Sequence, residues 1–459
     1  MIRADRSRLP AVGASDPFKF PPIVKQRLAN GLTVWCIEEH ALPLVSVLLV
    51  VPAGSASDPE ALPGLASLTG DMLDEGSGAR SAIDMHEAFA RLGTHLDIEV
   101  AADATTVGLT VLSRFIGRGV SLLADCAVRP SLREGDIERV RQLRLNRLAQ
   151  LRALAPVVAD RAFMQTLYGR HPYGHLAIGT EPALKNITQG DVMSFHAAAY
   201  VAERATLVAV GDVDAGELLQ VVHDAFGGWT RTEGAGPMVE FDAALSEPPA
   251  RSDACLALVD RSEAAQSELR VGHISVPRST PDYVPLLVLN MVLGGQFVSR
   301  INLKLREEKG YTYGARTSFD FRRGRGPFLL QTSVQTAVTA DAITDIFAEL
   351  NGIRSDRPVT EPELELAKSA LTLGYARNFE TTEQLARALV QLIVHDLPDS
   401  YYDTFPAQVG RVDRATVANV ASTYLEPDRM LTLVVGDRGA LERSLAAIGV
   451  GAPIALAAG

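Results

Sequence analysis

Two stretches of the sequence share one ordered pattern: residues 195–212 read FHAAAYVAERATLVAVGD, and residues 420–437 read VASTYLEPDRMLTLVVGD. Each contains a tyrosine, an acidic residue followed by arginine, an apolar run and a closing Gly-Asp. The arginine precedes the glycine by seven residues in both stretches. Because self-similarity at a fixed offset is the sign of a repeated structural unit, the sequence predicts two homologous halves offset by about 225 residues.

A linker between these halves is predicted at residues 231–252, which read RTEGAGPMVEFDAALSEPPARS. The segment is rich in Gly, Pro and polar residues and has little hydrophobic periodicity. The chain of 459 residues then divides into an N-terminal domain, 1–235, and a C-terminal domain, 250–459. Both are of ordinary domain size.

Strand and helix signals are mixed within each half. Apolar and β-branched runs predict strands at Leu32–Glu38, Val45–Val51, Thr105–Val111, Thr206–Val210, Thr312–Phe319 and Leu431–Val435. Three helix starts are marked by capping-box-like pairs, namely Ser81 with Asp84, Thr188 with Asp191 and Thr360 with Glu363. This mixture favours an α+β fold, in which each half is a mixed, largely antiparallel sheet packed with helices.

A long helix is predicted over Gly135–Ala153. Its apolar face would hold Ile137, Val140, Leu143, Leu145, Leu148 and Leu151, with several arginines on the outer face.

Composition excludes several classes of protein. The net charge of −11 disfavours binding to nucleic acid or to an anionic membrane. Cys36, Cys126 and Cys255 lie far apart and form neither a disulfide framework nor a CxxC metal site, so we expect buried thiols in a reducing compartment. The longest apolar stretch, Leu44 to Val51, is too short to cross a bilayer and is expected to be a buried strand. No signal peptide is visible, which favours the cytoplasm, with the periplasm as the alternative.

The histidines form no obvious metal site. His171 and His175 are four residues apart, but the Pro and Gly in HPYGH predict a tight loop and not a helical zinc pair. The sequence also lacks a Gly-x-Ser-x-Gly elbow, a Walker loop and a dinucleotide fingerprint.

The most specific stretch is Gly294–Phe319, GGQFVSRINLKLREEKGYTYGARTSF. A helix with Phe297, Ile301 and Leu305 at spacing four is expected to end at Lys309-Gly310, and a strand is expected to follow. Arg306 in the last turn and Tyr313 seven residues later could then face one cavity as two donors to a carbonyl oxygen that gains negative charge. Alternatively, Arg306 pairs with Glu307 or Glu308, and Tyr313 packs in the sheet.

The sequence resembles the pitrilysin/insulinase and mitochondrial processing peptidase family, the inverted-motif zinc peptidases. The likeness covers nearly the whole chain. It rests on Leu28-Ala-Asn-Gly31-Leu-Thr-Val34, Pro52-Ala-Gly54, Gly64-Leu-Ala66 with Met72, Gly179-Thr180-Glu181, the two Gly-Asp strand ends and Leu305-Arg306-Glu-Glu-Lys-Gly310-Tyr-Thr-Tyr313. The resemblance implies two similar α+β halves that face each other across a cavity.

The chain departs from the family pattern at the metal site. Active members carry H-x-x-E-H just after Gly-Leu-Ala, and the corresponding positions here are Ser67, Gly70 and Asp71. The third ligand of the family, a Glu roughly seventy-five residues further on, would fall near Asn146 and Arg147. The resemblance therefore implies that this chain holds no metal or cofactor of its own.

Arg306 and Tyr313 match the family's pair of residues that reach the substrate carbonyl at the zinc. The resemblance thus implies the zinc-less subunit of a heterodimeric zinc metallopeptidase, which encloses a cavity with a homologous H-x-x-E-H partner that binds the zinc. The substrate would be a peptide, bound neither to nucleic acid nor to membrane. A catalytically silent scaffold of the same fold is the alternative, and an independent hydrolase with another site finds little support. The peptide, the partner's identity, the higher oligomeric state and the sheet edge that binds peptide stay open.

Overall fold

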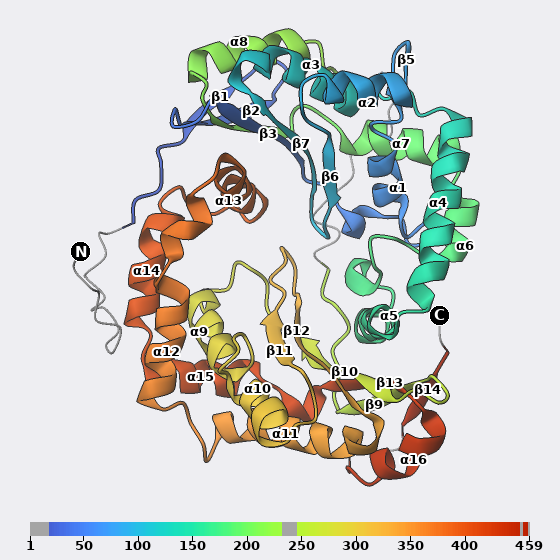
Figure 1. Cartoon of the computed structure of the whole chain (residues 1–459), viewed down its shortest axis with the longest axis vertical. Coiled ribbons are helices and arrows are strands. Elements are labelled where there is room, and N and C mark those ends of the chain that lie inside the picture. Colours follow the sequence, from blue (N-terminus) through green and yellow to red (C-terminus); the bar gives the residue numbers. More distant parts are fainter. Residues whose placement is uncertain (1–17, 232–245, 450–452, 458–459) are drawn as a thin grey trace, which may run out of the picture.

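The computed structural model describes residues 18–231, 246–449 and 453–457, so residues 232–245 of the expected linker lie outside the described part. The chain builds two six-stranded sheets, which occupy the upper and lower parts of the view in Figure 1. In spatial order, the first sheet contains β1 (Val24–Arg27), β2 (Thr33–Glu38), β8 (Thr206–Gly211), β3 (Leu44–Val51), β7 (Thr105–Leu112) and β6 (Asp97–Val100). The second contains β11 (Ala315–Phe319), β12 (Pro327–Gln335), β10 (Gln266–Ile274), β13 (Leu431–Gly436), β9 (Cys255–Asp260) and β14 (Ile454–Leu456).

Five strands of each sheet repeat one topology. Read from its other edge, the second sheet has the order β14-β9-β13-β10-β12-β11, in which β9-β13-β10-β12-β11 matches β2-β8-β3-β7-β6 of the first sheet. The remaining edge strands differ, because β1 pairs antiparallel with β2, whereas β14 pairs in parallel with β9. The strands β8 and β13 come from the two repeated sequence stretches. Each pairs in parallel with one neighbour (β2 or β9) and antiparallel with the other (β3 or β10). The predicted duplication and the mixed, largely antiparallel sheets are confirmed.

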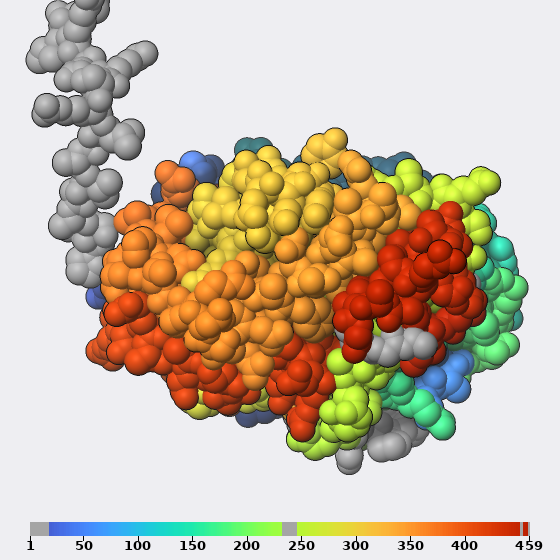
Figure 2. Space-filling model, turned by 90° about the horizontal axis from the view of Figure 1, so that it is seen from below, coloured from blue at the N-terminus to red at the C-terminus, as the bar shows by residue number. Residues whose placement is uncertain are grey.

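Helices cover the sheets and connect their strands. The first half contributes α1 (Leu65–Asp71), α2 (Ala82–Ala90), α3 (Ile116–Val128), α4 (Glu134–Arg152), α5 (Ala155–Tyr168), α6 (Glu181–Asn186), α7 (Gln189–Ala199) and α8 (Ala215–Phe226). The second half contributes α9 (Tyr283–Leu293), α10 (Arg300–Asn302), α11 (Thr339–Arg354), α12 (Glu361–Thr372), α13 (Thr382–Val394), α14 (Tyr401–Arg411), α15 (Arg414–Tyr424) and α16 (Arg438–Ala446). These later helices form most of the surface seen from below in Figure 2.

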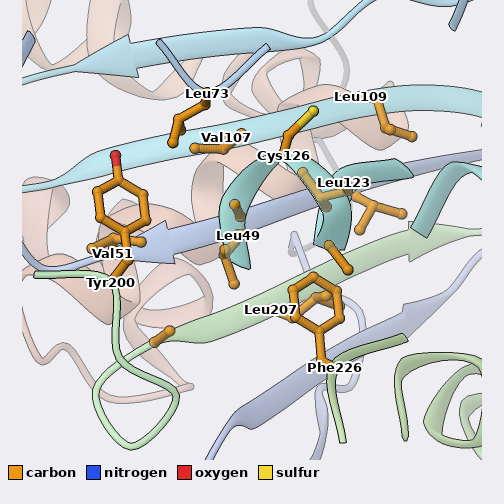
Figure 3. Close-up of a cluster of buried hydrophobic side chains, with 14 of the residues drawn as sticks. Leu49, Val51, Leu73, Val107, Leu109, Leu123, Cys126, Tyr200, Leu207 and Phe226 are labelled. Atoms are coloured by element: carbon orange, nitrogen blue, oxygen red, sulfur yellow. The ribbon is translucent and has the colours of Figure 1, made fainter. Parts of the chain in front are cut away.

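One face of the first sheet packs on its own helices. Figure 3 shows side chains of β3, β7 and β8, among them Leu49, Val107 and Leu207, meeting Leu123 of α3 and Phe226 of α8. All five are fully buried or nearly so. Removing this apolar surface from water stabilises the half by roughly 25 cal/mol for each Å² that is buried.

The opposite face of each sheet is covered by a helix from the other half. Leu385 and Leu389 of α13 pack on Val208 and Val210 of the first sheet. In the same way, side chains of α5 pack on the second sheet, where Phe163 belongs to one cluster with Leu431 and Leu433. In Figure 1, α13 and α5 lie between the two sheets. Each half therefore contributes one helix to the hydrophobic core of the other half. For this reason we propose the division into 1–235 and 250–459 as a description of the repeat and not of two independent folding units.

Some of the predicted boundaries of helices and strands are confirmed and others are not. All three expected capping boxes form, at the starts of α2, α7 and α12. The strand expected at Thr312–Phe319 begins only at Ala315, because Thr312 and Gly314 hydrogen-bond to each other in a tight turn (3.0 Å). The sequence analysis did not predict six strands of these two sheets, namely β1, β6, β9, β10, β12 and β14. Buried Arg270 and His273 interrupt the apolar pattern of β10.

Two details of the expected helices are wrong. Leu143 in α4 is 58% exposed, whereas Arg144 is buried, so an arginine faces inward where only apolar residues were expected. The helix before Gly310 starts at Arg300 and not near Gly294, because the N–H groups of Gly294 and Gly295 both bond to Asn290 and end the preceding helix. Phe297 consequently lies outside the helix and is 60% exposed.

Candidate functional site

A buried carboxylate fixes the start of α1, the helix that carries the three positions at which the family resemblance predicts a degenerate zinc motif. Asp58 accepts hydrogen bonds from the backbone N–H groups of Gly64 and Ala66, both at 2.6 Å. Its side chain is fully buried, and its Oδ2 lies 2.9 Å from Nε2 of His175. A buried carboxylate needs such donors to replace water. The arrangement therefore anchors α1 to the HPYGH loop.

Two glycines bring the Gly-Leu-Ala and Gly-Thr-Glu motifs together. Gly64 has a φ of +104° and Gly179 a φ of +81°, a region that favours glycine. A Cβ atom on Gly64 would lie 2.8 Å from the Cα of Gly179, so the two backbones touch. This contact requires glycine at both positions.

The histidines of HPYGH form the expected tight loop. Pro172–Gly174 is a single 3₁₀ turn, and Nδ1 of His171 accepts the N–H of Tyr173 at 3.1 Å. His175 faces Asp58 instead. Within residues 18–231, 246–449 and 453–457, no group of three His, Cys, Asp or Glu side chains is placed to hold a metal ion.

The three positions of the degenerate motif lie along α1. Ser67 and Asp71 are half-buried, and Gly70 is buried. A Cβ atom at position 70, where the family has its catalytic Glu, would approach Val100 of β6 to 3.0 Å and Ile98 to 3.3 Å. The absence of a side chain therefore lets β6 lie close against this helix.

A guanidinium lies beside the motif. Arg144 of α4 donates to Asp71 and also to the carbonyl oxygens of Ala177 and Ile178, each at 3.2 Å. Its side chain is 10% exposed, whereas that of Asp71 is 43% exposed. Arg144 follows Asp71 by 73 residues, near the interval at which the family supplies its third zinc ligand.

These residues do not fit a zinc ion. Structural and catalytic zinc sites need three or four thiolate, imidazole or carboxylate ligands, and here one carboxylate is already paired with a fixed cation. The Arg144 charge would repel a dication at the same place. We therefore derive no chemistry from a metal on this chain.

The second half presents the other predicted pair. Arg306 lies in a π-helical turn, Leu303–Glu308, which continues α10. Such turns are rare and are often found at functional sites. The guanidinium carbon lies 4.2 Å from the centre of the Phe297 ring, and Nε is 3.6 Å from Glu307. The Arg306 side chain is 34% exposed, so a ligand can still reach it.

Tyr313 follows the turn that ends this helix. Gly310 has a φ of +65°, and the N–H of Tyr311 bonds to the carbonyl of Leu305 at 2.8 Å, as expected for a glycine that ends a helix. The Tyr313 side chain is 94% exposed, so it does not pack in the sheet. A buried structural role is therefore excluded for this tyrosine.

The cavity between the halves is lined neither by the motif positions of α1 nor by the Arg306/Tyr313 pair. A cavity of about 580 Å³ lies between the halves, where β3, β6 and β7 of the first sheet meet α13 and the segment after β11. Its lining includes Glu99, Thr110 and Arg387, but neither Arg306 nor Tyr313, nor any of the three motif positions. Whether Arg306 and Tyr313 face one cavity with a partner stays a prediction.

Comparisons with known proteins agree with this architecture. The sequence pattern described as "Insulinase (Peptidase family M16)" matches residues 33–181, and the pattern described as "Peptidase M16 inactive domain" matches residues 186–371. Together they cover most of both halves. The chain belongs to peptidase family M16.

Curated relatives in family M16 have zinc-protease names. The chain is 26% identical over 443 residues to an uncharacterized zinc protease of Mycobacterium tuberculosis (95% of this chain and 98% of the relative). It is 25% identical over 402 residues to one from Mycobacterium leprae (87% of each). It is 24% identical over 407 residues to the mitochondrial-processing peptidase subunit beta of Mus musculus (87% of this chain and 81% of that protein).

Solved structures share the M16 fold. A peptidase M16 inactive domain from Pseudomonas fluorescens superimposes with a TM-score of 0.82 at 24% identity, covering 90% of this chain and 98% of that one. A protease from Helicobacter pylori gives a TM-score of 0.80 at 18% identity, with 90% and 99% covered. At these identities the likeness concerns the fold.

Sequence reasoning missed Arg144, although a signal for it existed. The buried positions of α4 are Ile137, Val140, Arg144 and Leu148, which follow the 3.6-residue period closely. An arginine on the apolar face of a helix is rarely buried without a counter-charge. The helical period of α4 therefore indicates that Arg144 is buried, but only the fold shows that its partner is Asp71.

Proposed function

We propose that this chain is the non-zinc-binding subunit of a heterodimeric M16 metallopeptidase. The observation that carries the proposal is the contrast between the halves. In the first, the zinc-motif helix meets a guanidinium. In the second, Arg306 and Tyr313 keep the family's types and spacing, on a π-helical turn and with an almost fully exposed tyrosine ring.

In this proposal the zinc belongs to a homologous partner with an intact H-x-x-E-H motif, and peptide hydrolysis takes place there. Arg306 and Tyr313 donate hydrogen bonds to the substrate carbonyl oxygen as it gains negative charge. Two fixed donors stabilise such an oxyanion better than water because they need no reorganisation. The guanidinium carbon of Arg306 lies 4.2 Å from the centre of the Phe297 ring, a cation–π contact that favours this position of the side chain.

The cavity of this enzyme would be completed by the partner, since Arg306 and Tyr313 do not line the cavity between the halves of this chain. The substrate would be a peptide. No helix in the described segments is long and apolar enough to cross a membrane. We propose a cytoplasmic location, with the periplasm as the alternative.

The test is reconstitution. The tagged chain is purified alone and with a co-expressed H-x-x-E-H partner, and cleavage of internally quenched decapeptides is followed. We expect no cleavage by the chain alone and cleavage by the complex. Arg306→Ala or Tyr313→Phe should lower turnover by roughly 10²–10³-fold without preventing assembly. Assembled complexes that cleave at full rate would remove the proposed roles.

The second candidate is a catalytically silent scaffold of the same fold. The packing of α5 and α13 on the sheet of the other half supports this candidate, because it joins the two halves through shared hydrophobic cores. In that case the complex would form without any gain in turnover over the partner alone. Metal analysis separates both candidates from an independent hydrolase, because stoichiometric zinc on the isolated chain would contradict either.

A further inference from the structure

A single buried side chain touches the supports of both proposed donors. Asn302, at the end of α10, is 4% exposed. Its Nδ2 donates to the carbonyl oxygen of Phe297 at 2.6 Å, and its Oδ1 accepts the N–H of Ala315 at 3.0 Å. The side-chain amide therefore links the loop before the helix to the first residue of β11.

Each contact supports one member of the pair. The Arg306 guanidinium carbon lies over the ring of Phe297, 4.2 Å from its centre. Ala315 lies two residues after Tyr313 and is the point where β11 enters the sheet. Asn302 thus connects the backbone below Arg306 with the backbone below Tyr313.

Burial alone would not hold the side chains of Phe297 and Tyr313 in place. The Phe297 ring is 60% exposed and Tyr313 is 94% exposed, so few packing contacts restrain either. The anchors of the helix itself, Ile301 and Leu305, are fully buried but point into the core. The polar contacts of Asn302 are therefore the restraint that the loop and the strand start share.

We propose that Asn302 is a positioning residue that sets the spacing between Arg306 and Tyr313. This inference rests on the proposed function, since it concerns turnover by the assembled complex. Small misplacements of groups that orient a substrate are costly, and an error of about 1 Å can lower a rate by about 10²-fold.

Two variants separate the two contacts. Asn302→Asp removes the N–H donor to Phe297 but keeps an acceptor for Ala315, and Asn302→Leu removes both. We expect turnover of the complex to fall about tenfold for the first and about a hundredfold for the second, with KM within about twofold. Asn290→Asp is the matched control. Its Oδ1 accepts the Thr317 hydroxyl at 2.8 Å on the same strand, and a carboxylate can still accept this bond.

A readout without substrate tests the geometry itself. Amide hydrogen exchange of Ala315, measured on the isolated chain, should become faster in Asn302→Leu and stay slow in Asn302→Asp. Thermal unfolding of each variant shows that it is folded. Equal protection of Ala315 in wild type and Asn302→Leu would overturn the proposed tether.

A double-mutant cycle shows whether Asn302 acts through the pair. In an Arg306→Ala/Tyr313→Phe background, the Asn302 variants should cause no further loss of turnover, because nothing is left to position. Full additivity would indicate a merely structural residue and overturn the inference. If Arg306→Ala lowers turnover and neither Asn302 variant does, the positioning role of Asn302 is wrong and the proposed function stands. If Arg306→Ala has no effect, the proposed function is wrong and the inference fails with it.

Discussion

Arg144 donates a hydrogen bond to Asp71 across 73 residues of chain, and Asp71 is one of the three positions at which the family resemblance predicts a degenerate zinc motif. The guanidinium also binds two carbonyl oxygens of the segment that follows the HPYGH loop. These contacts of one guanidinium therefore join α1, α4 and this segment.

This pair is asymmetric in burial, which predicts an asymmetric response. Asp71→Ala leaves the Arg144 cation buried without a counter-charge and should lower the free energy of unfolding by about 3 kcal/mol. Arg144→Met leaves Asp71 largely in water and should cost about 1–2 kcal/mol. Urea unfolding of the two variants measures both values. Arg152→Met on the same helix is the control and should cost less than about 1 kcal/mol, because Arg152 and its partner Glu181 are 42% and 34% exposed.

The proposed role of Arg306 depends on its planar guanidinium and not on charge alone. Arg306→Lys keeps the charge but loses the planar guanidinium over the Phe297 ring and its forked donor geometry. We expect turnover of the complex to fall at least tenfold, with assembly unchanged by size-exclusion chromatography. A Lys variant with wild-type turnover would show that only charge is needed there.

Chelation should separate the chain from its complex. No metal-binding group is present within the described parts of the chain, so o-phenanthroline should leave the Tm of the isolated chain unchanged within about 1 °C. The same chelator should abolish cleavage by the reconstituted complex, because the partner's zinc is required in the proposed function. A large drop in Tm of the isolated chain would reveal a metal that this proposal does not include.

His395 predicts a pH dependence of stability. Burial, followed by the nearby Arg278 charge, lowers the pKa of this imidazole to about 4 from its ordinary value of 6.5. The unfolded chain therefore takes up the proton first as the pH falls from 6.5 to 4, and stability present above pH 6.5 is lost over that window. We expect the free energy of unfolding to fall by about 1–3 kcal/mol between pH 6.5 and pH 4 because of this histidine.

His395→Gln should reduce the slope of unfolding free energy against pH between 6.5 and 4. The buried His196 and His273, whose pKa values burial also lowers, remain in the variant and supply the background slope. Urea unfolding at several pH values measures both proteins. Identical slopes would show that His395 does not contribute.

The exchanged helices predict that the halves unfold together. Leu389 of α13 is fully buried against the first sheet, so Leu389→Ala should cost 2–5 kcal/mol. Both tryptophans, Trp35 and Trp229, belong to the first half and report on its unfolding by fluorescence. A shift of the tryptophan transition by a substitution in the second half would demonstrate the coupling. Two separate transitions, with the tryptophan one unmoved, would contradict it.

Much of this protein was determined by local sequence. The Gly-Asp repeat predicted the duplication because its two copies share one ordered pattern, and three capping boxes predicted helix starts because each depends on residues close together in the chain. Gly310 ended the helix of Arg306 for the same reason, since glycine readily adopts a φ of +65°. The degenerate zinc motif at Ser67, Gly70 and Asp71 was inferred from the family resemblance and stays a prediction.

Tertiary structure decided what spacing could not. The pairing of Arg144 with Asp71, the tether from Asn302 to Phe297 and Ala315, and the exchange of α5 and α13 all join segments whose proximity depends on the complete fold. The sequence around a buried arginine is the same whichever carboxylate pairs with it, so it does not identify the partner. Sequence can therefore name the residues that must find partners, whereas long-range packing selects the partners.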